Sequence, residues 1–204
     1  MYQEAFAKLE LAEIATILDQ VNPEIDGTLF DPVETVILAQ DLPFYPGYRL
    51  LDIADHASVP PMRRYVAFKL DDFTILDFTN EPIYKLNQTV PITLKEENVA
   101  DYVRFFFTYV RGRHGRFIIT ENVDDIQWKE DPPPSARKAI GKMLFPIKLL
   151  NSDDAGGFNL KGCMVFKDSL FQAKIKVDAS GFVALSDEEL LVEDMPVLDD
   201  TFGQ

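Results

Sequence analysis

Residues 93–120 read TLKEENVADYVRFFFTYVRGRHGRFIIT and combine a strong helix signal with the start of a strand. Thr93 and Glu96 have the spacing of a capping box, in which each side chain satisfies a backbone N–H of the first helical turn, so a helix is predicted to begin at Thr93. From Val99 to Val110 nearly every position is apolar, which is typical of a helix buried on most sides. A glycine then ends this central helix, and RFIIT is predicted to leave as a strand.

The N-terminal part of the chain predicts a second helix followed by sheet. Residues 3–21 place apolar side chains at helical spacing and end at an Asn-Pro pair, which predicts an amphipathic helix. Alternating apolar and polar residues with turn-rich connections predict strands over residues 33–92, including one at residues 83–87.

The region after the central helix predicts a second block of strands. Residues 116–186 read as an antiparallel meander, interrupted by a short helix that Ser135 is expected to cap. Because the connections are short, hairpins are favoured over parallel crossovers. We therefore predict an α+β fold, a single domain over residues 1–186 in which antiparallel sheet packs on the buried central helix and the N-terminal helix covers one side.

The sequence changes character after Ser186. Residues 187–204 read DEELLVEDMPVLDDTFGQ, in which acids alternate with apolar side chains and no Lys or Arg occurs. Such a composition is typical of a segment that is loose on its own and docks on a complementary surface. We expect this acidic C-terminal segment to be flexible or docked, and to bind a protein partner through Leu190, Leu191, Val192, Glu193 and Asp194.

The sequence RGRHGR at residues 111–116 is a candidate anion-binding site. Its glycines allow tight backbone bends, and arginine is the side chain best suited to fork onto a carboxylate or phosphate. The candidate residues are Arg111, Arg113, His114 and Arg116. The competing interpretation is structural: cations complement the C-terminal end of a helix and pair with the protein's own carboxylates.

No catalytic, metal or cofactor residues are predicted. His56 stands near Asp52 and Asp55, which is half of a general-base arrangement, but no nucleophile motif accompanies it. Paired aspartates at 71–72, 124–125 and 153–154 lie where turns are expected, and none fits a calcium loop. The single cysteine, Cys163, excludes an internal disulfide and a multi-cysteine metal site. No phosphate-binding glycine loop is present.

Charge and hydropathy narrow the function classes. A net charge of −14 and a pI near 4.5 oppose binding to a phosphate backbone, so no nucleic-acid partner is expected. The absence of a leader pattern or of about 18 consecutive apolar residues predicts a soluble, cytoplasmic protein of bacterial type without a membrane partner. The sequence favours a non-enzymatic protein-interaction or regulatory module. The alternative is a protein or enzyme that binds a small anionic ligand through residues 111–116.

Overall fold

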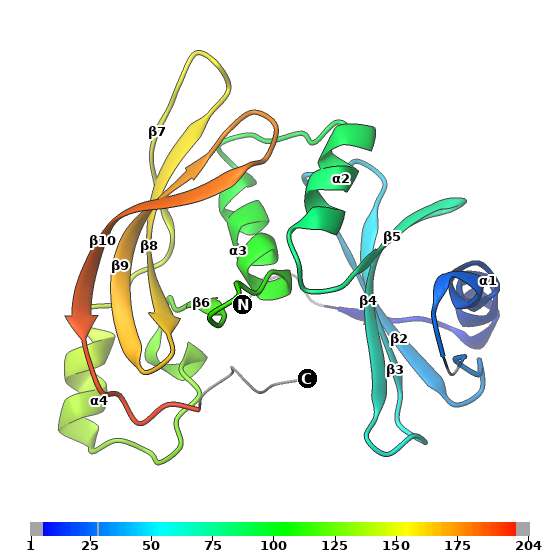
Figure 1. The fold of residues 1–204 in the computed structure, drawn as a ribbon, viewed down its shortest axis with the longest axis horizontal. Helices are drawn as coiled ribbons and strands as arrows, with labels where there is room; N and C mark the ends of the chain where they lie inside the picture. The colour runs from blue at the N-terminus through cyan, green and yellow to red at the C-terminus, as the bar shows by residue number, and fades with distance from the viewer. Residues whose placement is uncertain (1–5, 28, 199–204) are drawn as a thin grey trace. The chain divides into compact units, whose positions relative to one another are not determined.

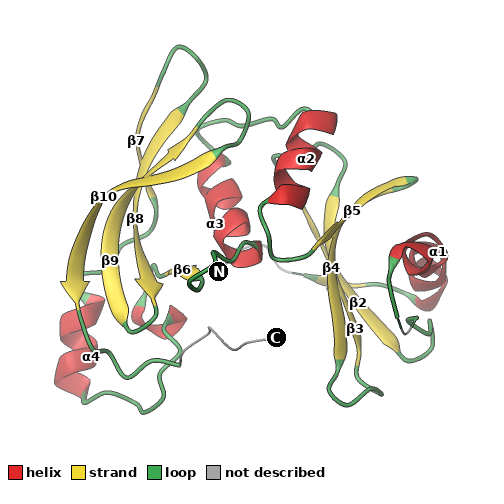
Figure 2. Cartoon of the chain, viewed as in Figure 1, coloured by secondary structure: helices red, strands yellow, loops and turns green. Residues whose placement is uncertain are grey.

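The computed structural model describes residues 6–27 and 29–198. The chain divides into two compact units, a first unit of residues 3–77 and a second unit from residue 78 onward. Both combine helix with antiparallel sheet, which confirms the predicted α+β class (Figures 1 and 2). That the two units act together as one domain stays a prediction.

The first unit is a five-stranded meander with one helix. Its strands pair antiparallel in the order β1-β2-β3-β4-β5. Their bounds are β1 Ala7–Lys8, β2 Thr35–Asp41, β3 Arg49–Asp55, β4 Met62–Lys69 and β5 Asp72–Leu76. The helix α1, Leu11–Val21, leads into a 3-10 turn, η1, at Asn22–Glu24.

Helix α1 packs because its apolar residues fall on one face. Ile14, Ile17, Leu18 and Val21 are buried at helical spacing. They form one cluster with inward residues of the sheet, among them Ile53. The predicted start of this helix at residue 3 is wrong, because Ala7 and Lys8 form strand β1 and pair with β2.

Tyr48 in this unit predicts a dependence of stability on pH that can be tested. Burial, and then the Asp72 carboxylate that accepts its O–H bond, raise the pKa of Tyr48 to about 12. Because the folded pKa exceeds the ordinary 10, the stability from this contact is complete below pH 10 and is lost as the pH rises toward 12. We expect Asp72→Asn to lower the pKa of Tyr48 while leaving it above 10, since burial remains. A ¹³C NMR titration of the Tyr48 ring checks this, and an unchanged pKa would contradict it.

The other five strands of the described residues belong to the second unit. Its sheet has the order β10-β9-β8-β6, and β7 also pairs with β8. The strands are β6 Phe117–Ile119, β7 Lys148–Ser152, β8 Phe158–Phe166, β9 Ser169–Val177 and β10 Val183–Val192. The helices are α2 Glu81–Thr89, α3 Val99–Tyr109 and α4 Pro134–Gly141, with a 3-10 turn, η2, at Val123–Asp125.

The central helix exists as α3, but it begins later than predicted. Thr93 and Glu96 form no capping box, because α3 begins at Val99 after Asn98, and Glu96 Oε1 accepts a bond from Ser152 Oγ at 2.8 Å. Asn98 instead holds the turn before the helix: its Oδ1 accepts from Lys95 N and its Nδ2 donates to Thr93 O, both at 2.8 Å.

Two other local predictions are wrong. Residues 83–87 lie within helix α2, where Pro82 suits the first turn and Ile83 and Leu86, three positions apart, are both buried. Ser135 does not precede α4, which begins one residue earlier at Pro134. In both places a proline at the first helical turn was the stronger signal.

The described part of the acidic C-terminal segment belongs to the fold of the second unit. Residues 187–192 continue strand β10, so the boundary after Ser186 is not an element boundary. Met195 and Val197 are buried. Met195 N donates to Asp168 O and Leu198 N to Gln127 O, each at 2.8 Å. Residues 199–204 of the predicted segment lie outside the described residues.

A buried ion pair at α3 was not foreseen. Arg104 lies inside α3 and is 8% exposed. Its guanidinium forks onto Glu121, with Nη2 to Oε1 at 2.7 Å and Nε to Oε2 at 2.9 Å. Asp101 accepts from Nη1 at 2.7 Å, and Ile147 N donates to Glu121 at 2.8 Å. The network ties α3 to the ends of β6 and β7.

Candidate functional site

Strand β10 forms one edge of the second unit's sheet. It pairs with β9 on one side, and its other side pairs with no strand of the described residues. Figure 1 shows it at the end of the sheet, beside β9. Residues 186–190 are exposed. An unpaired strand edge presents free N–H and C=O groups that can pair with another chain.

The register of β10 is broken at the start of its acidic part. Ser186 lies opposite Lys174 and Glu189 opposite Gln172, so Asp187 and Glu188 face a single residue of β9. Asp187 has a φ of 49°, consistent with a bulge. A second irregularity follows between Leu190 and Val192. Such bulges bend a strand and re-aim its side chains.

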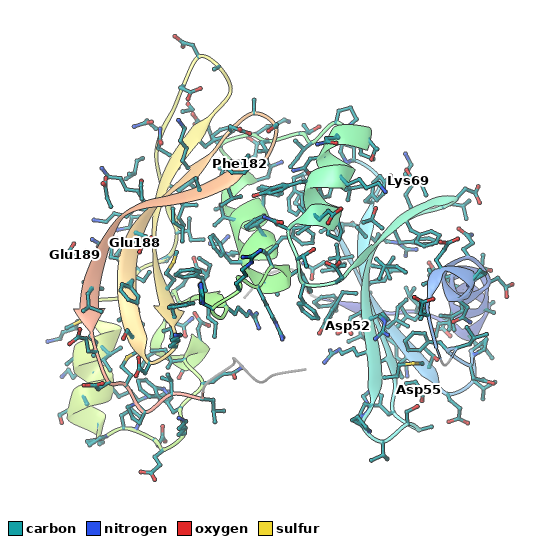
Figure 3. The ribbon with its side chains drawn as sticks, in the orientation of Figure 1. Asp52, Asp55, Lys69, Phe182, Glu188 and Glu189 are labelled. Carbon is teal, nitrogen blue, oxygen red and sulfur yellow. The ribbon has the colours of Figure 1, made fainter. Side chains whose placement is uncertain are left out.

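The exposed side chains of this edge are mostly acidic. The acids are Asp187, Glu188, Glu189, Glu193 and Asp194, and all five are exposed. Lys174 Nζ lies 2.7 Å from Asp187 Oδ2, and Gln172 Nε2 donates to Glu189 Oε2 at 2.9 Å. Figure 3 shows Glu188 and Glu189 on β10. We call residues 187–190 together with Glu193 and Asp194 the acidic edge.

The structure divides the predicted partner-binding residues into two kinds. Leu191 and Val192 are partly buried and pack against a cluster that includes Ile126 and Ile140. Leu190 is 44% exposed on the acidic edge, and Glu193 and Asp194 are exposed after it. Sequence reasoning left out Glu188 and Glu189, although the unbroken run of acids at residues 187–189 was a signal for them.

The sequence RGRHGR forms a tight hairpin turn. Gly112 N donates to Gly115 O at 2.9 Å and Gly115 N to Gly112 O at 3.2 Å. Gly115 has a φ of 134°, which a residue with a side chain rarely adopts. Arg113 and His114 form the tip and are exposed.

The two flanking arginines contact the chain's own groups. The Arg111 guanidinium lies 4.3 Å from the centroid of the Phe78 ring. Arg116 Nε donates to Phe107 O at 3.5 Å. The four candidate residues thus divide into two engaged arginines and two exposed tip residues. Anion binding at this turn stays a prediction.

The suggested pairing of His56 with acids is not formed, because both carboxylates bind elsewhere. Arg63 forks onto Asp52, with Nε to Oδ1 at 2.7 Å and Nη2 to Oδ2. Asp55 accepts bonds from the backbone N–H of Ala57 and from the Ser58 hydroxyl. Figure 3 marks Asp52 and Asp55 on β3, and His56 follows them exposed.

Cys163 and Trp128 take structural positions. Cys163 is buried, and its burial raises the pKa of the thiol. Trp128 packs against the cluster that also holds Met195 and Val197, and it bridges to Val197. These contacts attach the loop before α4 to the core of the second unit.

The described residues contain no helix long and apolar enough to cross a bilayer. Within the same residues, no three His, Cys, Asp or Glu side chains are grouped to hold a metal ion. Searches against known protein families, curated proteins and solved structures found no match for this chain.

Proposed function

We propose that this protein is a non-enzymatic protein-interaction module whose acidic edge binds a basic, extended segment of a partner protein. The observation that supports this most directly is the unpaired side of β10, which is available to an added strand. Strand addition to a sheet edge is a common mode of peptide recognition, in which backbone hydrogen bonds supply affinity and side chains supply specificity.

The side chains of the acidic edge indicate the chemistry of the partner. Glu188, Glu193 and Asp194 form no ion pair with a described residue. Lysines or arginines alternating along an added strand would meet these carboxylates, and charge complementarity of this kind raises the association rate. Leu190 supplies an exposed apolar contact between the acids.

Acids and bulges on an edge strand can serve to bind a partner, and they can also serve to prevent aggregation between sheets. The charge-reversal variant Glu188→Lys/Glu189→Lys separates the two uses. Lysine also protects an edge, so this variant should have the same oligomeric state and solubility as wild type. A basic partner, however, would now meet like charge.

The experiment is site-specific photocrosslinking in the native host. A benzoylphenylalanine at residue 188 should give a crosslinked product that one at the exposed Lys85 of α2 does not. Peptide mapping should place the crosslink in a Lys- or Arg-rich extended segment. The purified partner should then bind the Glu188→Lys/Glu189→Lys variant about tenfold more weakly, and wild type more weakly as salt rises.

Equal affinity of the partner for wild type and the charge-reversal variant would contradict the proposal. So would a product at residue 85 as strong as at residue 188. In either case the acids of β10 would serve edge protection alone.

A further inference from the structure

The first unit contains a cleft of about 290 Å³ between α1 and the adjoining ends of β3 and β4. This volume is near the lower end of ligand pockets, which run from roughly 300 to 1,000 Å³, and suits a small molecule. The cleft lies wholly within residues 13–70, so nothing in it depends on the acidic edge.

Two basic residues on neighbouring strands, Arg49 and Lys69, are among those that line this cleft. Arg49 on β3 is the register partner of Phe68 on β4, and Lys69 follows Phe68 directly. The stem of Lys69 lies along Gly47: a Cβ added to this glycine would be 3.6 Å from Lys69 Cε. Lys69 forms no ion pair with a described residue, and its Nζ lies 5.8 Å from the centroid of the Tyr48 ring. Figure 3 marks Lys69 at the end of β4.

One acidic residue, Glu13, also lines the cleft, and it forms an ion pair with Arg49. Glu13 Oε1 lies 2.7 Å from Arg49 Nη2. This contact holds the guanidinium at one corner, while Nε and Nη1 make no hydrogen bond to a described residue. Two basic residues and one acidic residue thus line this cleft, in a chain whose net charge is −14.

The rest of the lining is largely apolar. Ile17 of α1 and Phe68 also line the cleft, and packing holds both in place, with 1% and 4% of their surface exposed. Leu70, which is well exposed, stands at the margin. A ligand that fills this space would therefore carry a hydrocarbon part as well as a negative group.

We propose that the cleft binds a small carboxylate with a short hydrocarbon tail. Arg49 would bind the carboxylate through Nε and Nη1, and Lys69 on β4 would neutralise the charge of this carboxylate. Ile17 and Phe68 would cover the tail. Glu13 competes with the ligand for the guanidinium and so sets the affinity.

The test uses the full chain with hexanoate as the probe and hexylammonium and 1-hexanol as controls of the same tail. Binding is followed by ¹H–¹⁵N NMR and calorimetry. Hexanoate should shift the amides of residues 13–17, 47–49 and 68–70. Arg49→Gln and Lys69→Gln should each raise its Kd, the first about tenfold, since a charge-assisted hydrogen bond is lost. Lys85→Gln, on α2, removes the same charge elsewhere and should leave the Kd unchanged.

Glu13→Gln gives a prediction of opposite sign. It frees the guanidinium and removes a like charge, so hexanoate should bind about threefold more tightly. A structural role for the Arg49–Glu13 pair alone would not produce this gain.

The proposal is overturned if hexanoate shifts no amides of the cleft, or if hexylammonium or hexanol binds as tightly. Inorganic phosphate binding as tightly as hexanoate would overturn the role of the hydrocarbon tail. The Glu188→Lys/Glu189→Lys variant should bind hexanoate like wild type, so failure of the cleft and failure of the acidic edge are distinguishable.

Discussion

Gly181→Ala should lower the free energy of unfolding of the second unit by about 3 kcal/mol, because it combines backbone strain with overpacking. Gly181 has a φ of +78°, and an added Cβ would lie 2.5 Å from Asn87 Nδ2 and 2.9 Å from Tyr102 Oη. Neither side chain can move freely, since Asn87 Nδ2 donates to Tyr102 Oη at 3.1 Å and the Tyr102 hydroxyl donates to Gly181 O at 2.6 Å. The methyl group must break this chain of bonds.

The matched control is Gly156→Ala. Gly156 has nearly the same φ, +80°, but an added Cβ would meet only Ala179 Cβ at 3.4 Å, an ordinary contact. This variant should lose about 1 kcal/mol, the strain alone. Urea unfolding followed by Trp128, the only tryptophan, measures both, because Trp128 belongs to the second unit. Equal losses would show that the contacts of Gly181 are unimportant.

Glu121→Leu should destabilise the second unit by about 4 kcal/mol, since removing one member of a buried pair leaves the other charge uncompensated. The side chains of Arg104 and Glu121 are 10% and 7% exposed. Asp187→Asn is the control, because it breaks the exposed pair with Lys174 and should cost less than about 1 kcal/mol. A loss for Glu121→Leu no larger than that of the control would contradict the buried network.

The same carboxylate predicts an acid dependence of stability. Burial would raise the pKa of Glu121, but the bonds from Arg104 and from Ile147 N outweigh it and hold this pKa below its usual value. The unfolded state therefore takes up the proton first, and the contribution of Glu121 is present above about pH 4.3 and is lost as the pH falls through the folded pKa. Glu121→Gln should flatten the fall of unfolding free energy below that pH. An unchanged slope would count against it.

The strands were largely predictable because their signal is local. Strand β8, Phe158–Phe166, lies within the meander predicted over residues 116–186 and follows the apolar pattern there. The alternation in residues 171–177 likewise marks β9. Period-two patterning follows from burying one face of a sheet, and needs no knowledge of distant residues.

Element boundaries failed where distant groups decide them. Glu96 has the right spacing for a cap, yet it binds Ser152, fifty-six residues away. Arg104 lies within α3 and is paired in the interior with Glu121, which lies beyond β6. Neither contact follows from spacing, because each depends on how the strands after α3 return to it.

The two candidate sites differ in how much of each could be predicted from the sequence. The acidic edge is contiguous in sequence, so its composition was visible, while the exposure of Leu190 beside half-buried Leu191 required the bulged register. The cleft brings together Glu13, Arg49 and Lys69 from three elements. No spacing rule connects such residues.

The most direct test of the proposed recognition at β10 is amide hydrogen exchange of the full chain with its crosslinked partner segment supplied as a peptide. An added strand should slow exchange of those β10 amides in residues 186–190 that do not bond to β9, while α2 stays unchanged. Binding of the peptide without any slowing in β10 would contradict recognition at this edge.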